Sequence, residues 1–130
     1  MNPKHLNKLL DVVRQKNLID QDSEWSNGSE TYFREIRLEL DEVQEELDSD
    51  RNCYLEDELG DVFWDYLNLL LALEQEGKIS LSRVFERSLA KYSERIEGIQ
   101  QGVSWSEVKQ KQKQRLAEEQ AIEDHKAELI

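Results

Sequence analysis

Residues 54 to 75 form the most apolar stretch of the chain, and their apolar side chains recur at the three- and four-residue steps of a helix. Two faces of this helix are apolar. The predicted core face comprises Leu55, Leu59, Val62, Tyr66, Leu69 and Leu73, and the second face comprises Trp64, Leu67 and Leu71. A helix that is apolar on two faces must be covered on both, and a chain of 130 residues has few elements to cover them. The stretch therefore predicts a homo-oligomer, a dimer or a tetramer.

The rest of the chain also has helical patterns, with one proline, five glycines and no strand-like alternation. Helices are predicted over residues 3–17, 30–48 and 54–75. A fourth is predicted to begin near residue 80 and to be ended by Gly98 and Gly102. The second of them carries a predicted core stripe of Phe33, Ile36, Leu40, Val43 and Leu47. We expect an all-α bundle of four to five helices over residues 1–110, followed by a charged tail, 111–130, that is helical or partly disordered.

The charge of the chain limits its partners. With 29 acidic and 17 basic residues the formal net charge is −12, which repels nucleic acid and anionic membranes, so neither is expected as a partner. A small anionic ligand could bind only where metal ions or a local cluster of lysine and arginine reverse this field. The single cysteine, Cys53, cannot form an intrachain disulfide, and no apolar N-terminal segment is present. A cytoplasmic location is predicted.

An acidic pattern occurs twice, in "ELDEVQEEL" from Glu39 and in "ELGDVFWDY" from Glu58. The first copy contains Glu39 and Glu42, and the second contains Glu58 and Asp61, each pair one helical turn apart on a flank beside the core stripe. If the two helices pack as an antiparallel hairpin, the four carboxylates can converge on one point. Asp65 extends the second acidic flank and Asn68 follows one turn later.

Converging carboxylates need a counter-charge, because two of them about 5 Å apart repel by roughly 3 kcal/mol at an effective dielectric constant near 20. Hard oxygen ligands without histidine or cysteine suit Mg²⁺, with Mn²⁺ possible, better than zinc. Gly60 would let another backbone or a ligand approach closely, at a cost of about 1 kcal/mol in helix propensity. The alternative is that these residues are ordinary solvated acidic helix faces, which spacing alone leaves open.

The two acidic pairs, with "ELGD" at residues 58–61, resemble the signature of the MazG-type all-α nucleoside triphosphate pyrophosphohydrolases, in their small single-domain form. The resemblance extends from Trp25, in "SEWSNGSETYF", to about Lys113. It includes Lys91 and Arg95 in "AKYSERI", and Trp105 and Lys109 in "WSEVK". The chain departs from the family at Leu38, where a second glutamate is common, and in "IEGIQQG", which lacks a His-Pro stretch. These departures put substrate preference in doubt more than catalysis.

The resemblance implies Mg²⁺-dependent hydrolysis of a (deoxy)nucleoside triphosphate to the monophosphate and pyrophosphate, in the house-cleaning of nucleotide pools. In this interpretation Glu39, Glu42, Glu58 and Asp61 are catalytic residues that hold the metal, and a glutamate or the metal itself activates the water. Substrate-binding roles fall to Lys91 and Arg95 at the phosphates, Trp105 at the base, and Lys109 at the phosphates or sugar.

Other readings stay open for these residues and for the chain. Trp105 could instead pin the C-terminal segment to the core. The activity could be that of a dUTPase or dCTPase of the same superfamily, which a substrate panel would show. The chain could also be a non-catalytic helical oligomer, a binding or antitoxin-like module, whose acidic flanks are merely solvated.

Overall fold

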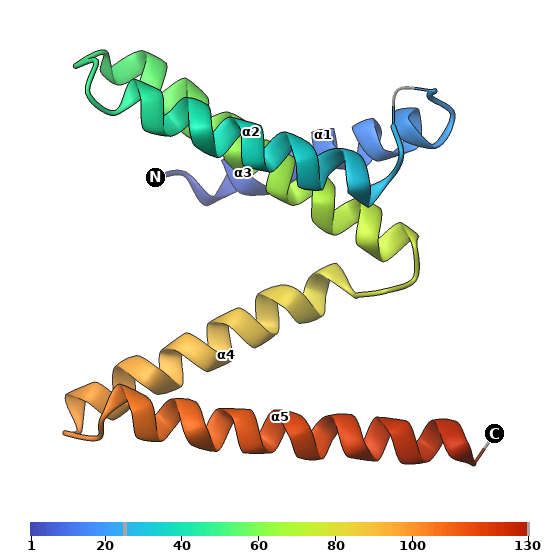
Figure 1. Cartoon of the computed structure of the whole chain (residues 1–130), viewed down its shortest axis with the longest axis vertical. Coiled ribbons are helices and arrows are strands. Elements are labelled where there is room, and N and C mark those ends of the chain that lie inside the picture. Colours follow the sequence, from blue (N-terminus) through green and yellow to red (C-terminus); the bar gives the residue numbers. More distant parts are fainter. Residues whose placement is uncertain (25, 130) are drawn as a thin grey trace. The chain divides into compact units, whose positions relative to one another are not determined.

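The computed structural model describes residues 1–24 and 26–129, which form five α-helices and, within these ranges, no strand (Figure 1). The helices are α1 (Pro3–Gln21), α2 (Ser29–Glu46), α3 (Asn52–Gln75), α4 (Leu81–Gln100) and α5 (Trp105–Glu128). The predicted all-α fold class is confirmed. None of the helices in the described ranges has both the length and the apolar character needed to cross a lipid bilayer.

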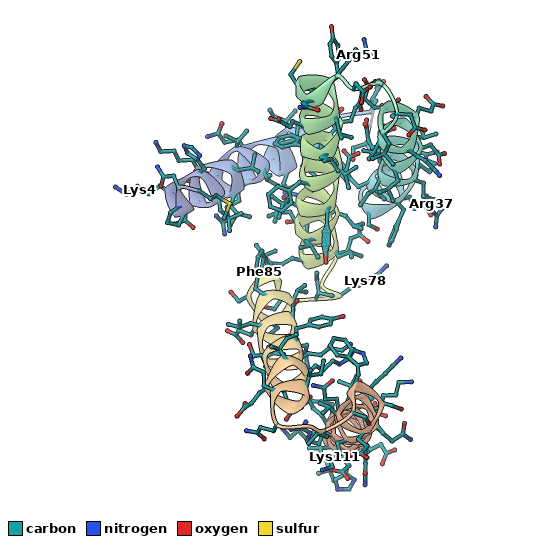
Figure 2. The ribbon with its side chains drawn as sticks, turned by 90° about the vertical axis from the view of Figure 1, so that its left-hand side faces the viewer. Lys4, Arg37, Arg51, Lys78, Phe85 and Lys111 are labelled. Atoms are coloured by element: carbon teal, nitrogen blue, oxygen red, sulfur yellow. The ribbon has the colours of Figure 1, made fainter. Side chains whose placement is uncertain are left out.

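The chain divides into two compact units, Met1–Leu81 and Ser82–Ile130. In the first unit α3 is the central helix, with α1 on one side and α2 on the other (Figure 2). The α2 and α3 helices run antiparallel and are joined by a short connection in which Asp50 has a positive φ of 58°. This is the hairpin that the duplicated acidic pattern requires.

The ends of these helices are fixed by local hydrogen bonds. Asn2 caps α1, its side chain accepting from the backbone N–H of Lys4 at 2.9 Å, and Pro3 follows at the first helical position, the residue at which this helix was predicted to begin. At α2, Gly28 has a φ of 66° and offers no side-chain cap. The Glu76 carboxylate, just beyond α3, replaces it by accepting from the backbone N–H and the hydroxyl of Ser29, both at 2.9 Å. The start of α2 is thereby attached to the end of α3.

The buried face of α3 differs from the prediction. Leu67 and Leu71, of the second apolar face, are buried, whereas Leu59 and Tyr66 of the predicted core face are 49% and 38% exposed. The assignment of the two faces was therefore wrong. Its physical reason is that α3 lies between α1 and α2, so that the faces turned toward these two neighbours are covered and the remaining apolar face is left in solvent.

The predicted core stripe of α2 is also wrong for the single chain. Phe33, Leu40 and Leu47 are exposed, while the buried residues of α2 are Ser29, Thr31 and Tyr32. Ile36 and Val43 of the same stripe are half-buried, as is Glu39 of the acidic flank, so only part of the apolar stripe is covered within the chain.

The second unit is the hairpin of α4 and α5, which turns at Gly102 with a φ of 82°. Its helices are held together largely by polar contacts: Arg87 pairs with Glu119, Arg115 pairs with Glu94, and the Gln112 side chain donates to the backbone carbonyl of Lys91. The side chain of Ser104 caps α5, which continues to Glu128, so the described part of the charged tail is helical.

Candidate metal centre

Three carboxylates meet where α2 and α3 pack together. Glu39 of α2 and Glu58 and Asp61 of α3 each offer one oxygen, and these oxygens all lie within 4.8 Å of one another. Glu58 and Asp61 share one face of α3 because they are one turn apart, and the antiparallel hairpin brings Glu39 opposite them. The structure therefore brings together three of the four predicted metal-binding residues.

The fourth, Glu42, lies beside this group. Its side chain and its charge contribute to raised pKa values of both Glu39 and Glu58, and its charge also raises the pKa of Asp61. For all three carboxyls burial is the largest cause of the raised pKa, and burial together with the neighbouring carboxylates brings the pKa of Glu39 to about 8. Burial and mutual repulsion thus both oppose ionisation, as expected of a cluster that has no counter-charge.

The residues present fit a divalent cation. Glu39 Oε2 and Glu58 Oε2 are buried and have no hydrogen-bond partner in the described part of the chain, so both are free to act as ligands. The donor set consists of carboxylate oxygens, which Mg²⁺ and Mn²⁺ prefer. Gly60 does not receive another part of the described chain, because a Cβ placed there would meet no atom within 4 Å. The predicted close approach of another backbone or a ligand to Gly60 stays a prediction.

The polar face of α3 continues beyond the cluster at the same three- and four-residue steps. Asp65 and Asn68 follow Asp61 on this face and are both buried. Burial raises the pKa of Asp65 to about 6, with further contributions from the charges of Glu35, Asp61 and Glu42. The sequence pattern gave the spacing of these two residues, but their depth of burial depends on the packing of α2 and α1 around α3.

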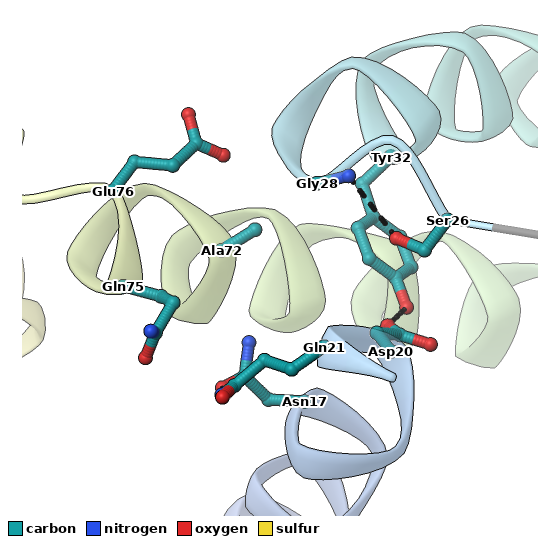
Figure 3. A pocket seen from close by; sticks show the side chains of 9 residues that line it. All are labelled: Asn17, Asp20, Gln21, Ser26, Gly28, Tyr32, Ala72, Gln75 and Glu76. Atoms are coloured by element: carbon teal, nitrogen blue, oxygen red, sulfur yellow. Dashed lines mark hydrogen bonds between the residues drawn. The ribbon is translucent and has the colours of Figure 1, made fainter. Parts of the chain in front are cut away.

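A polar hollow of about 220 Å³ lies at the far end of the same helices (Figure 3). Its walls come from α1, from the start of α2 and from the end of α3, and its lining residues are Asn17, Asp20, Gln21, Ser26, Gly28, Tyr32, Ala72, Gln75 and Glu76. The hydroxyl of Tyr32 donates to Asp20, which also pairs with Lys16. Burial and the hydrogen bond to Asp20 raise the pKa of Tyr32, so this hydroxyl keeps its proton. Sequence reasoning missed the hollow, since it depends on residues of three helices.

Three of the four predicted substrate-binding residues meet in the second unit, around the ring of Tyr92. The Arg95 guanidinium carbon is 5.2 Å from the centre of that ring and 5.0 Å from the Trp105 ring, and Lys91 Nζ is 5.7 Å from the Tyr92 ring. Arg95 is only 6% exposed, and its Nε donates to Gln112 Oε1 at 2.8 Å. No carboxylate forms an ion pair with Arg95 in the described part of the chain.

Of the remaining predicted residues, Lys109 is exposed on α5, and Trp25 lies outside the described residues. Tyr92 and Gln112 were not predicted, although both contact Arg95. Tyr92 had the appearance of one more apolar position on its helix. Gln112 stood among several similar polar residues of the tail, where spacing gives no means of choosing one.

Comparison with known proteins places these observations in a family. A family model described as the MazG nucleotide pyrophosphohydrolase domain matches residues 27–99, more than half of the chain. The match includes all four predicted carboxylates, Lys91 and Arg95, but ends before α5. No curated protein and no solved structure matches the chain.

Proposed function

Because the chain belongs to the MazG nucleotide pyrophosphohydrolase domain family, we propose that it hydrolyses (deoxy)nucleoside triphosphates to the monophosphate and pyrophosphate with Mg²⁺, or Mn²⁺ in its place. The observation that carries the proposal is the group of Glu39, Glu58 and Asp61, whose oxygens lie close enough together to hold one cation. The same family match supports a house-cleaning role that removes unwanted or excess nucleotides.

In the proposed reaction Glu39, Glu58 and Asp61 would hold the metal, with Glu42 beside them. When bound, the cation would neutralise the triphosphate and polarise the phosphoryl group. One carboxylate of the cluster accepts a proton from the attacking water. The water oxygen forms a bond to the α- or the β-phosphorus as the anhydride bond at that phosphorus breaks. The electron pair leaves on the bridging oxygen, with pyrophosphate if the α-phosphorus is attacked and with the monophosphate if the β-phosphorus is attacked. Phosphoryl transfer of this kind needs positioning and charge rather than covalent catalysis by the protein.

We assign the substrate contacts to Lys91, Arg95, Trp105 and Lys109. Arg95 supports this assignment, because a buried guanidinium without an ion-pair partner is costly, and an anionic group that reached it would offset this cost. The Arg95 guanidinium lies over the Trp105 ring, so we assign this tryptophan a second role beside stacking on the base: it holds Arg95 in place.

A homo-oligomer, dimer or tetramer, is part of the proposal. It is supported by the exposed apolar side chains of α2 and α3, among them Phe33, Leu40, Leu47, Leu59, Phe63 and Tyr66. The lone cysteine, exposed and free, is consistent with the proposed cytoplasmic location.

The direct test is hydrolysis of a panel of nucleoside triphosphates with Mg²⁺, with products identified by ³¹P NMR. We expect monophosphate and pyrophosphate from at least one substrate. Glu58→Gln should reduce kcat/KM at least about a hundredfold, because it removes a direct metal ligand. The matched control is Glu56→Gln, an exposed position on the same helix, which should leave the rate unchanged.

Release of orthophosphate alone, or turnover of no nucleotide, would overturn the proposed activity. Restriction of turnover to dUTP or dCTP would identify the dUTPase- or dCTPase-like alternative. Calorimetric titration tests the non-catalytic alternative, since a helical interaction module with solvated acidic faces would show weak Mg²⁺ binding that Glu39→Gln does not change.

A further inference from the structure

Asp65 and Asn68 are two buried hydrogen-bond acceptors that the proposed reaction does not use. They are 7% and 1% exposed, and Asp65 Oδ2 and Asn68 Oδ1 have no hydrogen-bond partner in the described part of the chain. A buried acceptor without a donor costs about 1 to 3 kcal/mol, so such atoms usually have a bound partner in the functional state.

The surroundings of both oxygens are defined. The amide nitrogen of Asn68 donates to the backbone carbonyl of Trp64 at 2.9 Å, which fixes the amide and leaves its oxygen as the unpaired atom. The charge of Asp65 contributes to the raised pKa of Tyr32, so the two residues lie near one another. The Tyr32 hydroxyl, however, donates to Asp20 and not to Asp65. The two oxygens are therefore acceptors that the described side chains leave without a donor.

The position of these acceptors relates them to the candidate metal centre. At 1.5 Å per residue, Asp65 is about 6 Å and Asn68 about 10 Å along α3 from Asp61. Ala72, one turn farther on the same face, lines the polar hollow, and so does Tyr32 (Figure 3). Asp65 and Asn68 thus lie between the carboxylates and the hollow, in line with both.

We propose that Asp65 and Asn68 accept hydrogen bonds from the sugar hydroxyls of the nucleoside whose triphosphate binds at the carboxylate cluster; this inference rests on the proposed function. Hydroxyls supply the donors that these acceptors lack, whereas phosphate oxygens are themselves acceptors and would be repelled. The sugar is also the part of a nucleotide next to the phosphates. Asp65 does not belong to the group of carboxylates whose oxygens lie within 4.8 Å in the described chain, so its position favours the sugar over the cation.

The test compares the ribo-, 2′-deoxy- and 2′,3′-dideoxynucleoside triphosphates of one base, each with Mg²⁺. For the wild-type protein, loss of a recognised hydroxyl should lower kcat/KM about tenfold to a hundredfold. In Asn68→Leu and Asp65→Leu, which remove the acceptor and keep a side chain of similar size, this discrimination should shrink to about threefold or less. On the dideoxy substrate, which lacks these hydroxyls, the loss of kcat/KM caused by Asn68→Leu should be smaller than on the ribonucleoside substrate.

Two further measurements exclude other roles. Calorimetric binding of the corresponding monophosphates should show the same sugar discrimination without turnover, and Mg²⁺ affinity should be equal in wild type and in Asn68→Leu, which changes no charge. If the wild-type protein has equal kcat/KM for the substrates with all three sugars, the inference is overturned and the proposed function is left intact. This measurement uses the wild-type protein alone, so it does not depend on whether a variant folds. Equal losses on all three substrates, or a loss of Mg²⁺ affinity in Asn68→Leu, would overturn it as well. No turnover of any triphosphate would overturn the proposed function and the inference together.

Discussion

The raised pKa of Glu39 makes the stability of the folded protein depend on pH. The Glu39 pKa of about 8 means that the folded protein binds a proton there over a range of pH in which an unfolded glutamate is already ionised. Ionising Glu39 in the folded protein opposes burial and the charges of Glu42, Asp61 and Asp65. The ionised residue is therefore tolerated at a cost in stability.

The metal-free protein should lose stability as the pH rises from about 4.5 to about 8. Below this range Glu39 is protonated in both states, and above it the residue is ionised in both, so the unfolding free energy falls across the window. After allowance for solvent screening, Glu39 should account for about 1 to 2 kcal/mol of this decline. Unfolding by urea in the presence of EDTA, at pH 5 and at pH 8, measures this decline in the unfolding free energy.

Glu39→Gln should make the profile flatter and the protein more stable than wild type at pH 8. The control, Glu56→Gln, changes an exposed carboxylate on α3 and should leave the wild-type profile in place. A wild-type stability that rises steadily between pH 5 and pH 8 would show that Glu39 is ionised in the metal-free fold without cost.

At the scale of helices, two glycines that look alike in sequence occupy different environments. A Cβ on Gly60 of α3 would meet no atom within 4 Å, whereas a Cβ on Gly98 of α4 would lie 2.7 Å from Val108 Cγ2 of α5. Val108 is buried and β-branched, so its methyl group cannot easily move aside. Gly98 therefore sets how closely α4 and α5 approach.

Gly60→Ala should stabilise the protein by about 1 kcal/mol through helix propensity, and Gly98→Ala should destabilise it by about 1 to 3 kcal/mol through overpacking. The two variants are matched, since each adds one methyl group within a helix. Circular dichroism during thermal unfolding shows whether each variant is more or less stable than the wild-type protein. A stable Gly60→Ala variant with reduced activity would support the predicted room for a ligand at Gly60, and wild-type activity would contradict it. Stabilisation by Gly98→Ala would contradict the close packing.

The helices themselves follow from sequence, because caps such as Asn2, the scarcity of proline and glycine and the three-four periodicity act locally. The convergence of Glu39, Glu58 and Asp61 could be predicted from the duplicated pattern once a hairpin was assumed. The face that each helix turns toward its neighbours could not be predicted in this way. An apolar stripe such as that of Leu40 has the same spacing whether it packs in the subunit core or against another subunit, so the pattern alone cannot distinguish the two. For the same reason burial of Arg95 could not be read from its spacing.

At the scale of the whole molecule, the exposed apolar faces of α2 and α3 predict self-association. Leu40 is 52% exposed within the apolar stripe of α2, and an arginine there would place a charge in the proposed subunit contact. Light scattering should give a wild-type mass of a dimer or tetramer of the 15.4 kDa chain, and Leu40→Arg should reduce it toward that of one chain.

The matched control is Ile122→Arg, at a similarly exposed apolar residue of α5 that is not a member of this stripe, and it should keep the wild-type mass. Circular dichroism should show that both variants remain helical. A wild-type protein that is a single chain at every concentration measured would contradict the proposed assembly.

The exposed ion pairs between α4 and α5 give this chain two opposite responses to ionic strength. Arg87–Glu119 and Arg115–Glu94 are solvent-accessible, so added electrolyte screens their attraction and loosens the hairpin. Association of copies that each carry a net charge of −12 is limited by repulsion, and the same electrolyte weakens that repulsion. Salt therefore favours assembly through apolar faces while it weakens the attachment of α5 to α4.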